Sequence, residues 1–148
     1  MSNTFALAYL VSAALFILGL KGLTSPATAR RGNYLAMTGM VIAIITTLFS
    51  PAINSYGLIV VGLAIGAAAG LFIAKRIEMT AMPQLVAALH SFVGLAAVLV
   101  AIGTFLNHRA EGTLHTGLMA ELFVGTFIGA ITFTGSVIAF GKLQGLIG

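Results

Sequence analysis

The chain has 148 residues, of which 59% are hydrophobic and only 7% are charged, and its net charge is +4. Because a soluble domain carries roughly 25% charged residues, three acidic and seven basic side chains are too few to cover a globule in water. This excludes a typical cytosolic enzyme, a disordered tail and, despite the positive charge, a nucleic-acid-binding protein. The absence of cysteine from the sequence excludes disulfide frameworks and thiolate metal sites. We therefore expect an integral membrane protein.

Five apolar stretches are long enough to cross a bilayer as helices, which takes roughly 20 residues. In chain order they run from Phe5 to Leu23, Tyr34 to Phe49, Tyr56 to Ala74, Pro83 to Leu106 and Leu118 to Phe140. None of them alternates apolar and polar residues as a barrel strand does. We predict a single all-α membrane domain over residues 1–148, a bundle of about five transmembrane helices with no soluble domain.

Basic residues in the loops predict the orientation, because they are enriched on the cytoplasmic side. The first loop, the third loop and the C-terminal end carry six of them: Lys21, Arg30, Arg31, Lys75, Arg76 and Lys142. The second loop, around Pro51 to Ser55, carries none, and the fourth carries only Arg109. The N-terminus is therefore expected outside and the C-terminus in the cytosol or matrix. Ala27 to Ala29 resembles a signal cleavage site, but no positive region precedes the apolar stretch, which disfavours cleavage.

Small residues on one helix face allow helices to approach closely in lipid. The third stretch has Gly62, Gly66 and Gly70 at a spacing of four, a pattern that indicates tight packing and no chemistry. A second packing face is expected on the second stretch, from Gly39, Ala43, Thr46 and Ser50. The fifth stretch places polar residues beside small ones on one face: Glu121, Gly125, Gly129, Thr132 and Ser136.

The fourth stretch contains the only ionisable residue that lies well inside a predicted span, His90. Spacings of three and four place this histidine in a stripe of small residues with Ala87, Gly94, Ala97, Ala101 and Thr104. Ionisable groups are costly in a membrane and are therefore functional candidates. Histidine also titrates near neutral pH, which suits a proton relay. The alternative is a neutral histidine that is hydrogen-bonded to a neighbouring helix.

Two further polar clusters allow both a structural and a functional interpretation. Glu121 is expected in the first turn of the fifth helix, where a carboxylate complements the helix dipole, but it could also stand at the mouth of a proton pathway. On the same face, Thr132 and Ser136 can hydrogen-bond to a neighbouring helix or to water. His108, Glu111 and His115 are expected in the fourth loop. They offer too few ligands to make a convincing metal site, so we expect them to be solvated loop residues.

The segment from Arg76 to Ala87, continued by Leu89 to Gly94, closely resembles the membrane domain (domain II) of the beta subunit of proton-translocating NAD(P) transhydrogenase. Further segments carry the same resemblance: Tyr9 to Leu20, Ala29 to Asn33, Phe127 to Ala130, Thr132 to Val137 and Phe140 to Leu143. The resemblance covers essentially the whole chain, and its histidine-centred segment is highly specific.

This resemblance implies an enzyme that couples hydride transfer from NADH to NADP⁺ to inward proton movement. The family's intramembrane histidine matches His90, its polar serine matches Ser136 and its acid matches Glu121. In the family, NAD(H) binds a domain of the alpha subunit and NADP(H) binds a soluble domain of the beta subunit, so no cofactor is expected on this segment. Family topology also has the beta-subunit N-terminus outside.

The same resemblance implies the partners and the location. Family beta subunits continue with further membrane helices and the NADP-binding domain, so we expect this chain to be part of such a subunit and unable to catalyse hydride transfer alone. Expected partners are the alpha subunit, those remaining parts of the beta subunit, a second protomer in a homodimer and the lipid bilayer. The expected location is the bacterial inner membrane, or the mitochondrial inner membrane in a eukaryote.

Two other functions compete with this interpretation. The first is a structural module that assembles a larger complex through Gly62, Gly66 and Gly70 and has no transport role. The second is a small transporter or channel that works alone. Substitutions at His90 would be silent in the first case, and the isolated chain would conduct protons or solute in the second.

Overall fold

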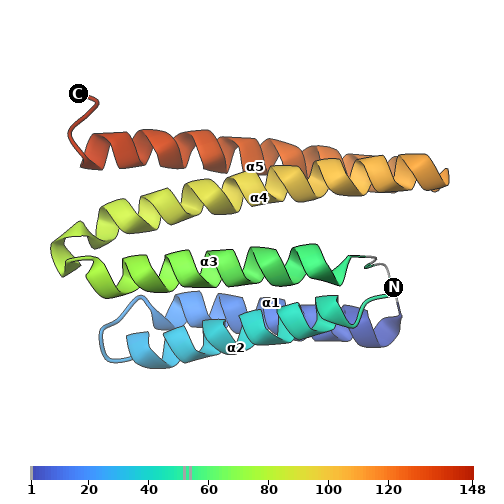
Figure 1. Cartoon of the computed structure of the whole chain (residues 1–148). Helices are drawn as coiled ribbons and strands as arrows, with labels where there is room; N and C mark the ends of the chain where they lie inside the picture. The colour runs from blue at the N-terminus through green and yellow to red at the C-terminus, as the bar shows by residue number, and fades with distance from the viewer. Residues whose placement is uncertain (1, 52, 54) are drawn as a thin grey trace. The chain divides into compact units, whose positions relative to one another are not determined.

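The computed structural model describes residues 2–51, 53 and 55–148, and their regular elements are all helical. In chain order these are α1 (Asn3–Gly22), α2 (Ala29–Leu48), α3 (Tyr56–Arg76), the short 3-10 helix η1 (Met79–Ala81), α4 (Met82–Glu111) and α5 (Thr116–Leu143) (Figure 1). The five predicted helices are thereby confirmed. The loop expected around Pro51 to Ser55 is only partly described, because Ala52 and Asn54 lie outside the described residues.

Four of these helices, α1, α3, α4 with η1, and α5, are long and apolar enough to cross a membrane. Helix α2 has the same length as α1, but its first two turns carry Arg30, Arg31 and Asn33. These side chains lower the mean hydropathy of α2, so the structure identifies four candidate spans among the described residues where the sequence predicted five.

Two helices extend five residues beyond a predicted bound, further than the others do. Helix α2 begins at Ala29, although its apolar stretch begins at Tyr34, and α4 continues past Leu106 to Glu111. Polar residues at a helix end still form the backbone ladder, so apolarity alone underestimates helix length. Helix α4 ends where Gly112 adopts a left-handed conformation (φ 69°), a backbone geometry that glycine accepts readily.

The chain forms two compact units, one up to Ala69 and the other Gly70–Gly148, which divide within α3. In the first unit α1 lies along α2, and the contact depends on glycine. A Cβ atom added to Gly32 would come within 2.6 Å of the Gly19 carbonyl oxygen, and one added to Gly39 would come within 2.9 Å of the Ser12 oxygen. The two backbones therefore approach as closely as small residues permit.

One buried hydrogen bond joins α1 to α2. The hydroxyl of Ser12, which is only 3% exposed, donates to the backbone oxygen of Gly39 at 2.6 Å. Nearer the other end of the hairpin, the hydroxyls of Tyr9 and Thr47 are 2.8 Å apart. These two contacts fix the register of the pair.

Replacing Ser12 by Ala should destabilise the subunit by about 1 kcal/mol, the size expected for one hydrogen bond between membrane helices. The loss stays modest because the Gly39 carbonyl oxygen can still accept from its own helix. Thr38→Val is the matched control, since the Thr38 hydroxyl is exposed and donates to Tyr34 within α2. Detergent-titrated unfolding of the complete subunit measures both variants. Equal losses would mean that the Ser12 bond contributes nothing specific.

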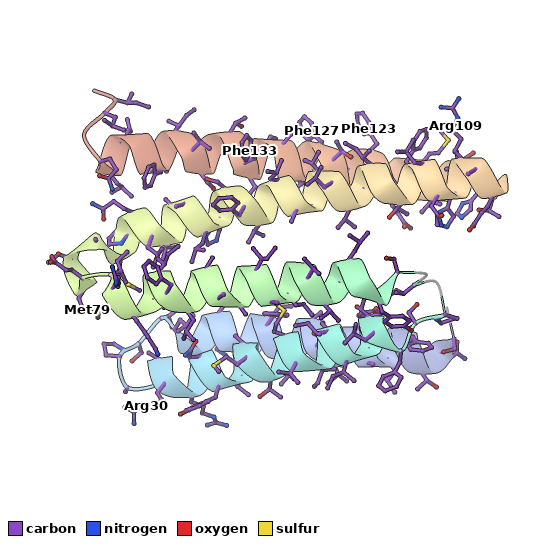
Figure 2. The ribbon with its side chains drawn as sticks, viewed as in Figure 1. Arg30, Met79, Arg109, Phe123, Phe127 and Phe133 are labelled. Carbon is purple, nitrogen blue, oxygen red and sulfur yellow. The ribbon has the colours of Figure 1, made fainter. Side chains whose placement is uncertain are left out.

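In the second unit α4 lies along α5, and a glycine from each helix lies at the contact. A Cβ atom added to Gly94 would lie 2.5 Å from the Phe133 nitrogen and 2.8 Å from the Gly129 oxygen. One added to Gly129 would lie 2.8 Å from the Gly94 oxygen. Gly125 faces open space instead. The α5 side chains Phe123 and Phe127 are 73% and 59% exposed and suit contact with lipid (Figure 2).

Helix α3 has no buried residue. A Cβ atom added to Gly62, Gly66 or Gly70 would meet nothing within 4 Å in the described structure. The predicted glycine face is therefore accessible along α3. The tight helix packing expected at this face is not seen with the described helices and stays a prediction.

Candidate functional site

His90 lies in α4, eight residues after Met82, or about 12 Å along the helix. Its Nδ1 atom is 2.9 Å from the backbone oxygen of Val86, one turn earlier. A carbonyl oxygen only accepts, so Nδ1 is the nitrogen that carries hydrogen in this arrangement. In the neutral ring the lone pair is then on Nε2, and Nε2 is the atom at which a proton can bind.

The stripe of small residues predicted around His90 is covered by α5 only in part, and its member Ala97 lies at the edge of the contact beside Gly129. Gly94 and Ala101 are buried, whereas His90 and Ala97 are exposed in this chain. Ser91, which was not part of the predicted stripe, is buried instead. The contact with α5 is therefore displaced toward the Ser91 side of α4, and His90 lies on the flank of that contact, where another helix or water can reach its ring.

The register of the α4–α5 pair places Ser136 at the height of His90. Gly94 faces the turn from Gly129 to Phe133. In an antiparallel pair, four residues back on α4 correspond to four residues forward on α5, so His90 is level with the turn from Phe133 to Val137. Ser136 lies in this turn and is half-buried.

Glu121 does not share this level. It lies fifteen residues before Ser136 on α5, about 22 Å along the helix. The prediction that Glu121 occupies the first turn is wrong, because α5 begins at Thr116 and its first turn contains no acidic residue. Glu121 is exposed, and no side-chain hydrogen bond joins it to His90 or Ser136 among the described residues. Because helix-dipole effects fall off beyond the first turn, a purely local dipole role is weakened.

The hydroxyl groups near this level bond within their own helices. Ser91 donates to the Ala87 oxygen at 3.2 Å, and Thr132 donates to the Ile128 oxygen at 2.8 Å. Thr132 therefore does not form the bond to a neighbouring helix that the sequence allowed. Such bonds satisfy a hydroxyl without tying two helices together.

A polar group that the sequence analysis did not single out joins the two helices at one end. The Nε2 atom of Gln84 donates to the backbone oxygen of Leu143 at 3.3 Å, while its Oε1 atom is buried and has no hydrogen-bond partner in the described structure. The one sequence signal for Gln84 is a polar amide directly after Pro83 at the start of an apolar helix.

The polar residues between α4 and α5 are placed differently from the prediction. His108 and Glu111 belong to the last turns of α4 and not to the loop, because the helix ends only at Gly112. His115 caps α5, with its Nδ1 accepting from the Leu118 backbone nitrogen at 3.1 Å. Within the part of the chain that the structure describes, no three His, Cys, Asp or Glu side chains gather to hold a metal ion.

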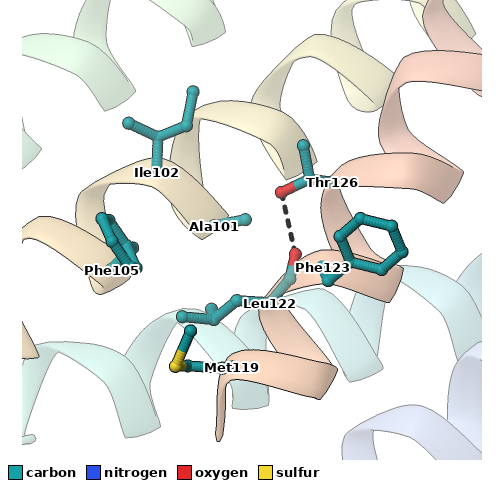
Figure 3. Close-up of a pocket in the computed structure, with 7 residues that line it drawn as sticks. All are labelled: Ala101, Ile102, Phe105, Met119, Leu122, Phe123 and Thr126. Atoms are coloured by element: carbon teal, nitrogen blue, oxygen red, sulfur yellow. Dashed lines mark hydrogen bonds between the residues drawn. The ribbon is translucent and has the colours of Figure 1, made fainter. Parts of the chain in front are cut away.

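A cavity of about 300 Å³ opens between α4 and α5 on the far side of Gly94 from His90 (Figure 3). Its lining is apolar apart from Thr126, whose hydroxyl donates to the Leu122 oxygen at 2.8 Å. The lining includes Phe105 and Phe123. The cavity provides no group for proton transfer. The regular elements of the described residues are all helical, so they include no strand–turn–helix of the dinucleotide-binding type.

Four long apolar helices, with a histidine inside one of them, define a multi-pass helical membrane protein. The family model of the NAD(P) transhydrogenase beta subunit matches residues 5–148. The chain belongs to this family. Two curated relatives named NAD(P) transhydrogenase subunit beta, one from Rhodospirillum rubrum and one from a designated strain of that organism, are 57% identical to it over 145 residues. The match covers 95% of this chain and 31% of each relative, so the chain spans less than a third of their length.

Proposed function

We propose that this chain forms part of the proton-conducting membrane domain of an NAD(P) transhydrogenase, in which proton translocation is coupled to hydride transfer from NADH to NADP⁺. His90 takes up and releases the proton at Nε2. Ser136, at the same level on α5, orients the ring or a water beside it, and Glu121 stands nearer the other membrane surface as a pathway mouth.

The observation that carries this proposal is the placement of His90. Its Nδ1–H is held by the Val86 oxygen, and its side chain is exposed on the flank of the α4–α5 contact. A histidine serving only to tie α4 to α5 would lie in that contact, as Gly94 does. Replacing His90 in the complete enzyme and measuring proton translocation together with nucleotide binding tests the proposal.

The partners and cofactors follow from the family. We propose that the alpha subunit, the remaining helices and the NADP-binding domain of the beta subunit, and a second protomer surround this chain in the complete enzyme. NAD(H) and NADP(H) bind those other domains. The accessible glycine face of α3 supports contact with neighbouring membrane helices, since small residues let helices approach closely. The proposed location is a bacterial inner membrane, or the mitochondrial inner membrane in a eukaryote.

We further propose that α2 also crosses the membrane, which makes five spans with the N-terminus outside. The support is the pairing of α2 with α1, which extends from Gly32 to Thr47. Five spans place the loop after α1 and the loop after α4 on opposite sides. If α2 lay on the membrane surface, both loops would be on the same side.

Cysteine labelling distinguishes these topologies, because the chain has no cysteine of its own. Ala27 and Thr113 are exposed residues of the two loops. In intact cells a membrane-impermeant maleimide should label Thr113→Cys and leave Ala27→Cys unlabelled, and permeabilised cells should show both labelled. Labelling of both variants, or of neither, in intact cells would contradict the five-span topology.

A further inference from the structure

A second cavity, of about 450 Å³, lies between the end of α1 and the start of α2. Its lining is graded along the helices. Lys21, Thr24, Thr28 and Arg31 lie toward the connecting loop, and Leu18 and Leu35 lie about one turn deeper. A charged rim at the loop end and an aliphatic floor toward the helix centres match the chemistry of a lipid at the membrane surface.

The positive charge of this cavity is not balanced within its unit. Residues 1–69 contain Lys21, Arg30 and Arg31 but no Asp or Glu. Basic residues at a cytoplasmic loop are ordinary for a membrane protein. A cavity that gathers two of them between helix ends, in a unit without a carboxylate, is the feature that calls for an anionic ligand.

The backbone at the start of α2 adds to this preference. The first N–H groups of a helix have no partner within the helix and favour an anion. The hydroxyl of Thr28, the residue before α2, accepts no hydrogen bond from them, and its own hydrogen is donated to the Gly22 oxygen at 2.6 Å. The hydroxyl of Thr24 likewise donates to the Lys21 oxygen at 2.7 Å. Donors for an anion therefore come from the two cationic side chains and the α2 backbone.

The close approach of Gly22 and Gly32 fixes the shape of the cavity. A Cβ atom added to Gly22 would lie 2.7 Å from the Cα atom of Gly32. This contact holds the ends of α1 and α2 together, so Lys21 and Arg31 flank one space and do not splay apart.

We infer that this cavity binds the phosphate group of an anionic membrane lipid, with Lys21 and Arg31 on the phosphate and Leu18 and Leu35 against the glycerol and upper acyl chains. Free phosphate has the same charge chemistry, but it leaves the aliphatic floor without a partner. The inference goes beyond the proposed proton pathway and does not depend on it, so a His90→Ala enzyme should bind the lipid as the wild type does.

The test is native mass spectrometry of the complete, delipidated enzyme titrated with phosphatidylglycerol or phosphatidylcholine in neutral detergent. Lys21→Gln and Arg31→Gln should each weaken the tightest phosphatidylglycerol site about fivefold, and the double variant about 25-fold, from the usual contribution of one cation at a membrane surface. Arg31→Lys should retain most of the binding. Should Arg31→Gln fail to assemble, Lys21→Gln tests the same site.

Arg30→Gln is the matched control, because Arg30 neighbours Arg31, is equally charged and exposed, and does not line the cavity (Figure 2). It should change binding by less than about twofold. If Arg30→Gln weakened phosphatidylglycerol binding as much as Arg31→Gln does, the binding would come from general surface charge and not from this cavity. Equal binding of phosphatidylcholine, or displacement of the lipid by millimolar inorganic phosphate, would also overturn the inference.

Discussion

In the complete enzyme, His90→Ala should reduce proton-coupled turnover by about 100-fold or more, which is the usual contribution of a positioned proton-transfer group. Affinity for NADP(H) should change little, because the proposed nucleotide sites lie on other domains. Coupling between two sites is reciprocal, so if proton binding at His90 responds to NADP(H), then NADP(H) affinity must respond to pH. That pH dependence should flatten in the variant.

His108→Ala provides the control for this experiment. His108 lies on the same helix, and its Nδ1 is also 2.9 Å from a carbonyl oxygen one turn earlier, that of Thr104. It occupies the last turn of α4, where it is half-buried, and not the interior of the span. Turnover should stay within about threefold of wild type, as for a residue outside the reaction path. Proton pumping in reconstituted vesicles and NADP(H) titration measure both variants. Wild-type coupling in His90→Ala would remove this residue from the mechanism.

Adding a methyl group where α4 and α5 contact each other, by replacing Gly94 with Ala, should strongly destabilise the subunit. Gly94→Ala would place Cβ at 2.5 Å from a backbone nitrogen and 2.8 Å from a backbone oxygen of α5. Backbone atoms cannot rotate away as a side chain can, so the helices must separate. We expect a loss of about 2–3 kcal/mol in the stability of the subunit, the upper range for overpacking, and a fall in proton pumping because His90 is one turn away.

Gly103→Ala is the matched control for the crossing. Gly103 lies on the same helix, nine residues further on, and a Cβ atom there would meet nothing within 4 Å in the described structure. The stability of the Gly103→Ala variant should stay within about 0.5 kcal/mol of wild type, as for a substitution away from a packed contact. Thermal unfolding of the complete subunit in detergent compares the two. Equal stability of Gly94→Ala and wild type would contradict the close crossing.

The sequence predicted the helices well because each is an uninterrupted apolar stretch, and it predicted their ends less well. Apolarity marks the part of a helix that suits lipid, whereas the backbone continues through Arg30 and Arg31 at one end and through His108 at another. The same polar residues lengthen α2 and lower its hydropathy. Helix length and membrane span are therefore separate questions for this element.

The sequence could not tell which part of a small-residue stripe meets a neighbouring helix. Ala97 and Ala101 were equivalent in the stripe, yet Ala97 is exposed and Ala101 is buried. The packing face predicted on α2 included Gly39 and Thr46, which are buried, but α1 was not identified as its partner although a signal existed. The buried residues of each helix repeat every seven positions: Ser12 and Gly19 in α1, and Gly32, Gly39 and Thr46 in α2. A spacing of seven keeps residues on one helix face.

The self-contained hydrogen bonding of α4 and α5 has a mechanical consequence. Ser91, Thr126 and Thr132 all donate within their own helix, and Gln84 makes the only side-chain hydrogen bond between these two helices in the described residues. A small rotation of α4 against α5 would therefore break no hydrogen bond except at the Gln84 end. The pair is held by a side-chain hydrogen bond at one end, and along the rest of its length no side-chain hydrogen bond opposes a rotation of one helix against the other.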